Sequence, residues 1–390
     1  MTVHFTITRL RALIVAAAVV AAVLGASFTG LVPIAASSGH LAPIGWFLHW
    51  TMRNAVRTQS LAVENPSGLA LTDRGLIRRG AGHFATGCAP CHGAPGLLQS
   101  PVVLSMTPPP PRLEDRVGDW RDRELFWVVR HGVKYTGMPA WPTQKRDDEV
   151  WAEVAFLRAL PEMSAETYAR LALGGEEPDG AVGNDELPAA DAVLESALAE
   201  CARCHGRAGL GQGPRGAFPV IAGQSADYLF ATLKAFAKGE RKSGFMQPPA
   251  RRYGTETLRR LADHFSSRPA GEALGALSGD GLVAAEDLLE EGRRIATEGV
   301  PSRKIPACES CHGHAGRARN PHYPWITGQP RWYLSTHLRL WREEKRGGTA
   351  YAHVMAETVD GITEEQIEAV SAWYASQPLP ASPVSAAEQR

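Results

Sequence analysis

The chain has 390 residues, of which 44% are hydrophobic and 21% are charged, and its 41 lysines and arginines balance 41 aspartates and glutamates. A formal net charge of zero argues against nucleic acid as a partner, so any electrostatic docking must come from local patches. The length exceeds what one small core needs and indicates two to four domains of about 100 residues each.

An uncharged apolar stretch near the N-terminus runs from Ala12 to Gly39 and is long enough to cross a bilayer. An aromatic and basic cluster that suits a membrane-water interface follows it, made of Trp46, Phe47, Trp50, Arg53 and Arg57. We therefore expect residues 1–60 to form a retained membrane anchor with an interfacial segment. The alternative is a cleaved leader followed by an ordinary amphipathic helix.

All six cysteines lie in three copies of one pattern, in which two cysteines flank two residues and a histidine follows. The copies are Cys88-Ala-Pro-Cys91-His92, Cys201-Ala-Arg-Cys204-His205 and Cys308-Glu-Ser-Cys311-His312. This is the attachment signature of c-type haem, because two thiols a helical turn apart can form thioethers with the porphyrin while the histidine binds the iron. Zinc sites, thioredoxin-like motifs and disulfides also use paired cysteines, but they do not explain a histidine after every pair. The sequence predicts three covalently bound haem c groups.

Covalent haem attachment is an extracytoplasmic process in bacteria. Basic residues flank both ends of the apolar stretch, so charge bias alone does not fix its orientation. We expect the haem domains on the periplasmic side of the bacterial inner (cytoplasmic) membrane.

The three motifs recur at nearly even spacing, with 113 residues from Cys88 to Cys201 and 107 from Cys201 to Cys308. Each stretch can hold one small helical domain whose thin core is enlarged by a porphyrin. We expect an all-α chain with three small cytochrome c-type haem domains in tandem after an N-terminal transmembrane helix. The expected domains are residues 71–172, 189–268 and 282–380, joined by linkers at 173–188 and 269–281. The glycine-rich and acidic composition from Gly174 to Pro188 predicts a mobile tether.

In the first domain, a helix is predicted from Gly80 to Cys88, where the glycine allows close approach of a second helix. Asp147 to Leu160 predicts that second helix, ended by Pro161 and with one apolar face made of Val150, Trp151, Val154 and Leu157. Thr107 to Pro111 predicts an extended loop that packs around the haem edge, and the alternative is a proline-rich ligand for a partner protein.

The second and third domains repeat each other. Phe218 to Gln224 matches Tyr323 to Gln329 at an offset of 105 residues, and three further positions recur at the same offset, Tyr228, Leu229 and Leu233 as Tyr333, Leu334 and Leu338. Each domain ends in a predicted helix, Thr255 to Phe265 and Thr363 to Ser376. The second of these has the pattern of a capping box formed by Thr363 and Gln366, with Ile362 placed to pack on Ile367.

One methionine stands at a comparable place in every domain. Met138 lies 46 residues after His92, Met246 lies 41 after His205, and Met355 lies 43 after His312. A thioether as sixth ligand raises the potential of a haem relative to a second imidazole. We predict these methionines as iron ligands. The alternatives are core methionines that fill gaps, Met106 for the first haem, and His264 or His353 for the others.

Residues 80–160 resemble a class I cytochrome c domain in the Gly-x-x-x-Phe-x-x-x-Cys-x-x-Cys-His start and the Gly-Met-Pro-Ala-Trp loop that contains Met138. Residues 190–380 resemble the dihaem cytochrome c4 family in both modules. The resemblance implies His205 with Met246 on one iron and His312 with Met355 on the other, in two modules that pack as a pair and share propionate contacts. The family often shows Met-Ala-Pro-Met-Ala, and here the second methionine is replaced by Pro249 and by Thr358.

The resemblance implies an electron carrier and not an enzyme. We expect a membrane-tethered triheme c-type cytochrome of a respiratory chain, whose donor is a quinol-oxidising complex or a soluble cytochrome and whose acceptor is a terminal oxidase. The alternative is the cytochrome c subunit of a membrane-bound alcohol, aldonate or sugar dehydrogenase, although residues 378–390 are short and polar and the anchor is N-terminal. A haem enzyme, such as a peroxidase or a thiosulfate-oxidising cytochrome, would need an open axial position.

Basic residues cluster near two of the methionines. Arg241, Lys242, Arg251 and Arg252 flank Met246, and Arg339, Arg342, Lys345 and Arg346 precede Met355. They are able to steer an acidic partner toward the haem edge, and the alternative is that they pair with haem propionates or are simply solvated.

Overall fold

The computed structural model describes residues 8–30, 34–66, 68–173, 191–211, 216–270, 286–313 and 320–379. The regular elements in these ranges are helices, which confirms the predicted all-α class. Nearly all of the two expected linkers, and residues 380–390, lie outside the described residues.

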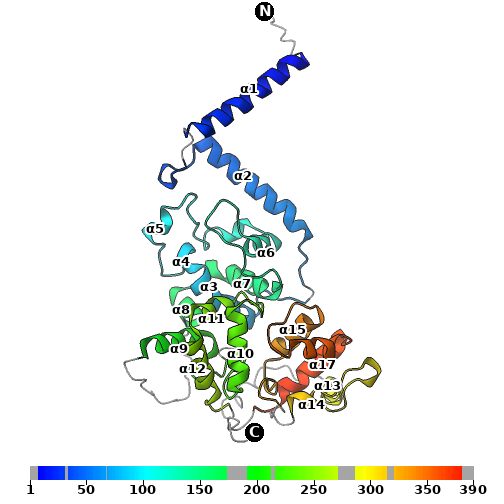
Figure 1. The fold of residues 1–390 in the computed structure, drawn as a ribbon. Helices are drawn as coiled ribbons and strands as arrows, with labels where there is room; N and C mark the ends of the chain where they lie inside the picture. Colours follow the sequence, from blue (N-terminus) through cyan, green and yellow to red (C-terminus); the bar gives the residue numbers. More distant parts are fainter. Residues whose placement is uncertain are drawn as a thin grey trace, which may run out of the picture.

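Figure 1 shows the order of the helices along the chain. They are α1 Arg9–Phe28, α2 Ala42–Gln59, α3 Arg74–Gly87, α4 Ala89–His92, α5 Pro101–Leu104, α6 Asp122–His131, α7 Asp147–Ala159, α8 Ala165–Ala172, α9 Ala192–His205, α10 Ala226–Ala237, α11 Gln247–Arg252, α12 Thr255–Ser266, α13 Glu286–Glu298, α14 Glu309–His312, α15 Arg331–Arg342, α16 Ala352–Val359 and α17 Glu364–Ser376.

Helix α1 is apolar over 20 residues and extends away from the remainder of the chain (Figure 1). Its length and composition allow it to cross a membrane, and a signal sequence near an N-terminus meets the same criteria. The helix is shorter than the predicted stretch to Gly39, because it ends at Phe28 and the chain leaves the helical conformation at Gly30, which adopts a φ of 70°. In α2, Trp46 stacks on Trp50 with a centroid distance of 6.2 Å, and both rings are exposed.

The first helical module comprises α3 to α8, and its centre is the predicted contact between α3 and α7. A Cβ atom on Gly80 would lie 2.3 Å from the carbonyl oxygen of Ala152, so the two helices approach this closely only because residue 80 is glycine. Beside this contact, Phe84 packs on Phe156 with ring centroids 4.8 Å apart. The predicted pair of helices is confirmed.

Helix α7 is buried on more than the predicted face. Val150, Trp151, Val154 and Leu157 are buried as predicted, but Ala152 and Ala155 on the other side of the helix are buried as well. These two alanines pack with Leu76 and with Phe245, which belongs to the second module. The additional buried face therefore packs mainly on α3 of the same module, and Phe245 adds a contact from the second module.

The second module comprises α9 to α12 and the third comprises α13 to α17. Helices α10 and α15 begin and end at positions 105 residues apart, in agreement with the sequence repeat. At the start of α17, Thr363 Oγ1 accepts from Gln366 N at 3.3 Å and Thr363 N donates to Gln366 Oε1 at 3.1 Å, which confirms the capping box. Ile362 and Ile367 are buried in one cluster, as predicted.

The second and third modules meet through contacts that repeat across the pair. Gln224 Nε2 donates to the carbonyl oxygen of Trp325 at 2.8 Å, and Gln329 Nε2 donates to the carbonyl oxygen of Val220 at 2.8 Å. Each of these positions in the second module has its counterpart 105 residues later, so the two bonds are related by pseudo-twofold symmetry. A small apolar cluster that contains Val220 and Trp325 lies between the modules.

The first module packs directly on this pair, and Figure 1 places it between the N-terminal helices and the other two modules. The guanidinium of Arg79 lies 3.9 Å from the ring centroid of Trp332 in the third module. Glu149 accepts hydrogen bonds from Ser243 and Gly244 of the second module. Buried hydrogen bonds therefore join the first module to the second, and the contact of Arg79 with Trp332 joins it to the third. The segment that the composition predicts to be a mobile tether lies outside the described residues.

Candidate haem sites

The three histidines that follow the cysteine pairs share one hydrogen-bonding arrangement. In each case the Nδ1 atom of the histidine lies within hydrogen-bond distance of a proline carbonyl oxygen. The distances are 2.8 Å for His92 and Pro111, 3.0 Å for His205 and Pro219, and 2.7 Å for His312 and Pro324. A carbonyl oxygen only accepts, so each Nδ1 carries the proton and donates. Each Nε2 is thereby left unprotonated and able to bind a metal.

Burial lowers the pKa of His92, His205 and His312 below the usual value for histidine. The hydrogen bond to the proline carbonyl raises the pKa, but this effect is smaller than that of burial. The neutral imidazole is the form that binds iron, so the fold favours the ligating state. At the first site, the loop that ends at Pro111 supplies the acceptor, and Gln99 Nε2 donates to the preceding carbonyl of Pro110 at 2.7 Å. The predicted packing of this loop against the haem motif fits these bonds better than a role as a ligand for a partner protein.

Three of the cysteine sulfurs in the second and third motifs, those of Cys201, Cys204 and Cys308, are in surroundings that disfavour the charged thiolate. Burial raises the pKa of Cys201 and of Cys308 to about 12, and it raises that of Cys204 to about 11. Uncharged sulfur, as in a thioether, is the form that these surroundings favour.

The second and third motifs line one continuous cavity of about 1430 Å³. Ordinary small-molecule pockets measure roughly 300–1,000 Å³, so this space is large enough for two bulky groups. The cavity is lined by both cysteine pairs and by His205, Met246, His312 and Met355. The structure thus brings together the residues that the sequence assigned to the second and third haems.

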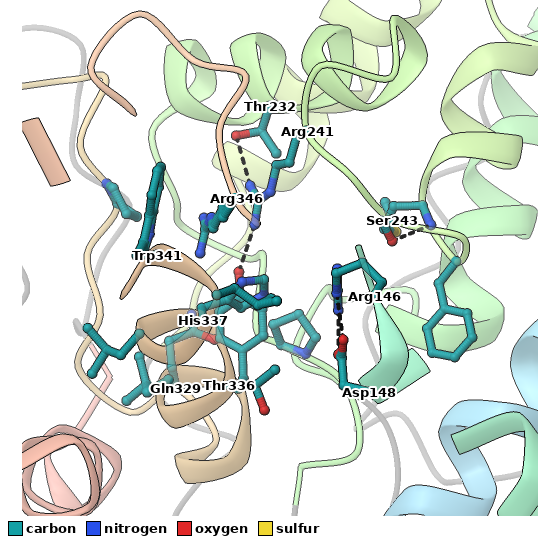
Figure 2. Close-up of a pocket in the computed structure, with 18 of the residues that line it drawn as sticks. Arg146, Asp148, Thr232, Arg241, Ser243, Gln329, Thr336, His337, Trp341 and Arg346 are labelled. Atoms are coloured by element: carbon teal, nitrogen blue, oxygen red, sulfur yellow. Dashed lines mark hydrogen bonds and ion pairs between the residues drawn. The ribbon is translucent and has the colours of Figure 1, made fainter. Parts of the chain in front are cut away.

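Three arginines, one from each module, converge on the part of the cavity shown in Figure 2. Arg241 and Arg346 occupy equivalent positions 105 residues apart in the repeat. The Nε atoms of both are buried with no hydrogen-bond partner among the described residues. Burial and the neighbouring Arg241 lower the pKa of Arg346 to about 10, while Tyr333 and Tyr228 raise it. Arg146 of the first module lies in the same cavity but is already paired with Asp148 and Glu149.

Buried guanidinium groups without an anion are costly, so this cavity is built to receive negative charge. Haem propionates are anions of suitable size, and the residues present therefore fit two haem groups. Arg339 and Arg342 differ from Arg241 and Arg346 in having a carboxylate partner, because both pair with Glu364 in the third module. That pairing leaves these two side chains less suited to steering a partner.

The proposed axial methionines differ in local structure. Met246 precedes the first turn of α11, whereas Met355 lies inside α16. His353, the rival of Met355, is exposed and does not line the cavity. His264 does not line the cavity either. At the first site, a Cβ atom on Gly137 would lie 2.0 Å from the methyl carbon of Met106, so this rival lies beside Met138 and both stay candidates.

Sequence reasoning did not find two groups of residues around these sites. The proline carbonyls that orient the histidines carry no side-chain signal, although Pro219 and Pro324 do recur in the repeat. Glu149, which bonds to the loop before Met246, is separated from that loop by more than 90 residues. The sequence offered one signal for this contact, namely that Glu149 is a charged residue within the mostly apolar helix α7.

Comparison with known proteins gives matches over two parts of the chain. The family model described as cytochrome c oxidase, cbb3-type, subunit III matches residues 75–157. The thiosulfate dehydrogenase electron acceptor of Thiomonas intermedia is 31% identical over 204 residues, which is 52% of this chain and 89% of that relative. Cytochrome c4 of Azotobacter vinelandii is 28% identical over 186 residues, 47% of this chain and 86% of the relative. A solved cytochrome c4 structure from Acidithiobacillus ferrooxidans is 29% identical, covers 45% of this chain and 98% of its own, and has a TM-score of 0.39.

The helical modules, the three motifs and these relatives define an electron-carrying protein with haem as its cofactor. Such proteins bind haem c covalently through paired cysteines. The chain belongs to the c-type cytochromes and contains a cytochrome c4-like segment, as the sequence resemblance predicted.

Proposed function

We propose that the chain carries three covalent haem c groups and transfers electrons in a respiratory chain while tethered to the bacterial inner membrane. The observation that carries the proposal is the repeated bond from a motif histidine to a proline carbonyl, because it prepares Nε2 of His92, His205 and His312 as an iron ligand. When bound, haem c supplies an iron that gains and loses one electron.

In this proposal the cysteine pairs hold the three groups, and Met138, Met246 and Met355 supply the sixth ligands. Their thioethers favour a high potential and leave no open position for substrate, which suits a carrier and not a catalyst. Arg241 and Arg346 hold propionates of the second and third groups. The position of Met246 and Met355 on the cavity wall supports this assignment.

The tether is helix α1, and the exposed aromatic rings of α2 suit the membrane-water interface that follows it. The haem modules then lie on the periplasmic side, where a donor such as a quinol-oxidising complex or a soluble cytochrome delivers electrons. The acceptor is a terminal oxidase. Confinement to the membrane raises the effective concentration of both partners.

The test is oxygen uptake by membranes of a strain that lacks this chain. Uptake driven by quinol-derived electrons should be slow, and addition of the purified reduced protein should restore it. A variant with both Cys201 and Cys204 changed to alanine is the matched control, and it should not restore the rate because the electron path is broken. Unchanged oxygen uptake in the deletion strain through every oxidase would overturn the proposal.

A second candidate donor is favoured by the name of the relative that is 31% identical, a thiosulfate dehydrogenase electron acceptor. In that case the chain takes electrons from a thiosulfate dehydrogenase or a related primary dehydrogenase. Rapid mixing of the oxidised chain with that enzyme and thiosulfate distinguishes the two donors. Reduction of the haems within the turnover time of the enzyme favours the dehydrogenase, and reduction only by a quinol-oxidising complex favours the first candidate.

A further inference from the structure

The segment from Lys242 to Met246, which we term the ligand loop, is held by the first module through three polar contacts. Arg146 Nη1 donates to the carbonyl oxygen of Lys242 at 3.1 Å. Ser243 Oγ donates to Glu149 Oε1 at 2.5 Å, and the Gly244 amide donates to Glu149 Oε2 at 2.5 Å. Arg146 Nη1 also pairs with Glu149 Oε1 at 2.8 Å, which ties the two holding residues together.

Ser243 continues this chain of bonds to the proposed iron ligand, because its Oγ accepts from the Met246 amide at 3.0 Å. With that lone pair occupied, the hydroxyl hydrogen is directed to Glu149. Ser243 and Glu149 are each 2% exposed, so water does not compete for either bond. The carboxylate therefore fixes the backbone of Met246 through one intervening side chain.

Apolar contacts close the loop from both sides. A Cβ atom on Gly244 would lie 2.2 Å from Trp141 Nε1, so the loop backbone lies directly against that ring. Phe245, the residue before Met246, packs on Trp141 at 5.7 Å and on His83 at 5.4 Å between ring centroids. Both partners belong to the first module, so the ligand loop is inserted into that module and is not merely adjacent to it.

The third module lacks this arrangement. Counted from the preceding helix, the position equivalent to Ser243 is Gly348, and counted back from the methionine it is Ala352. Neither residue has a hydroxyl, and Met355 lies in a helix instead of a loop. The backbone of Gly348 lies against Arg241, since an added Cβ would be 2.4 Å from the Arg241 nitrogen. The pseudo-twofold symmetry of the pair is thus broken at the second site, where the first module docks.

We propose that Glu149 of the first module is a positioning residue for the methionine ligand of the second haem, acting through Ser243 on Met246. Docking of the first module would thereby hold the Met246 thioether in place when the second haem is bound. The inference rests on the proposed ligation of the second haem by Met246. It adds a dependence of that ligand on a different module of the chain.

The experiment uses the full haem-loaded chain and imidazole, which displaces methionine from oxidised haem and removes the weak near-infrared band of histidine-methionine ligation. In Ser243→Ala and Glu149→Gln, about one third of the band should be lost at an imidazole concentration about tenfold lower than in the parent chain, because one buried hydrogen bond is broken. The other two thirds should titrate as before. A redox titration should show one potential displaced and two unchanged.

Two further variants make the outcome decisive. Lys145→Ala removes a bond from the same segment of the first module to the carbonyl oxygen of Glu344 in the third module, without touching the ligand loop, and should titrate like the parent. Met246→Ala should lack one third of the band before imidazole is added. If Met246→Ala keeps the whole band, the ligation itself is wrong and the inference falls with it. If Met246→Ala loses its third but Ser243→Ala and Glu149→Gln titrate like the parent, or Lys145→Ala is affected equally, the positioning role alone is refuted.

Discussion

Glu153 is a fully buried carboxyl group beside the first haem motif. Its Oε1 atom lies 3.6 Å from Cys88 Sγ, and its other oxygen has no hydrogen-bond partner among the described residues. Burial raises the pKa of Glu153 to about 8, against the hydrogen bond from Cys88, which lowers it. A thioether at Cys88 has no S–H to donate, so haem attachment removes the only effect that lowers this pKa.

The sign of the resulting pH dependence follows from proton counting. Between the ordinary carboxyl pKa of 4.5 and about 8, the unfolded chain has released this proton and the folded chain retains it. Glu153 therefore destabilises the fold increasingly as the pH rises through this window. We expect Glu153→Gln to raise the melting temperature at about pH 9 and to change it little at about pH 5. Thermal unfolding of the haem-loaded chain measures this, with exposed Glu162→Gln as a control. An equal effect of Glu153→Gln at both pH values would contradict the burial argument.

The methionine assignment is also tested at single residues. We expect Met138→Ala, Met246→Ala and Met355→Ala each to remove about one third of the near-infrared band, because each takes a thioether from one iron. Met106→Ala and His353→Ala are the matched controls and should keep the band whole. Loss of intensity in Met106→Ala with none in Met138→Ala would move the first ligand to Met106.

Among single residues, those with a fixed local spacing could be predicted from the sequence. The cysteine pairs and their histidines form one contiguous pattern, and the methionines stand at regular distances from them. The partner of each histidine is a backbone carbonyl, and any residue type supplies one. No composition or periodicity therefore pointed to Pro111, although the proline-rich loop was placed at the haem edge.

At the scale of elements, the contact of α3 with α7 depends on one missing side chain. We expect Gly80→Ala to destabilise the first module by about 1–3 kcal/mol, since the new Cβ would meet the Ala152 carbonyl and force the helices apart. This outcome opposes the gain of about 1 kcal/mol that alanine brings in an ordinary helix. Chemical denaturation followed by absorbance of the first haem measures it. Gly118→Ala, in the same module and with nothing within 4 Å of an added Cβ, should change stability by less than about 0.5 kcal/mol.

Helix α7 shows where the prediction of elements ends. Its bounds and one apolar face could be predicted, because Val150, Trp151, Val154 and Leu157 recur at helical spacing. The burial of Ala152 and Glu149 could not, because alanine and glutamate are common on exposed helix faces. Ala152 takes its role from the close approach of α3, and Glu149 takes its role from contact with the ligand loop of another module.

At the scale of the whole molecule, the repeat of the second and third modules was visible in the sequence and the docking of the first module was not. The repeat leaves matched residues such as Gln224 and Gln329, which form equivalent bonds across the pair. The docking depends on contacts such as that of Arg79 with Trp332, which join residues far apart in the chain and match no motif. The mobile tether stays a prediction from linker composition, and the described contacts join the first module to the pair.

The central claim is that one chain holds three covalent haems, and the number of haems per chain tests it most directly. Pyridine haemochrome spectroscopy combined with the intact mass of the denatured chain should give three haems, as the three motifs require. A variant with Cys308 and Cys311 changed to alanine should give two and serves as the internal calibration. A ratio of one or two in the unmodified chain would contradict the account.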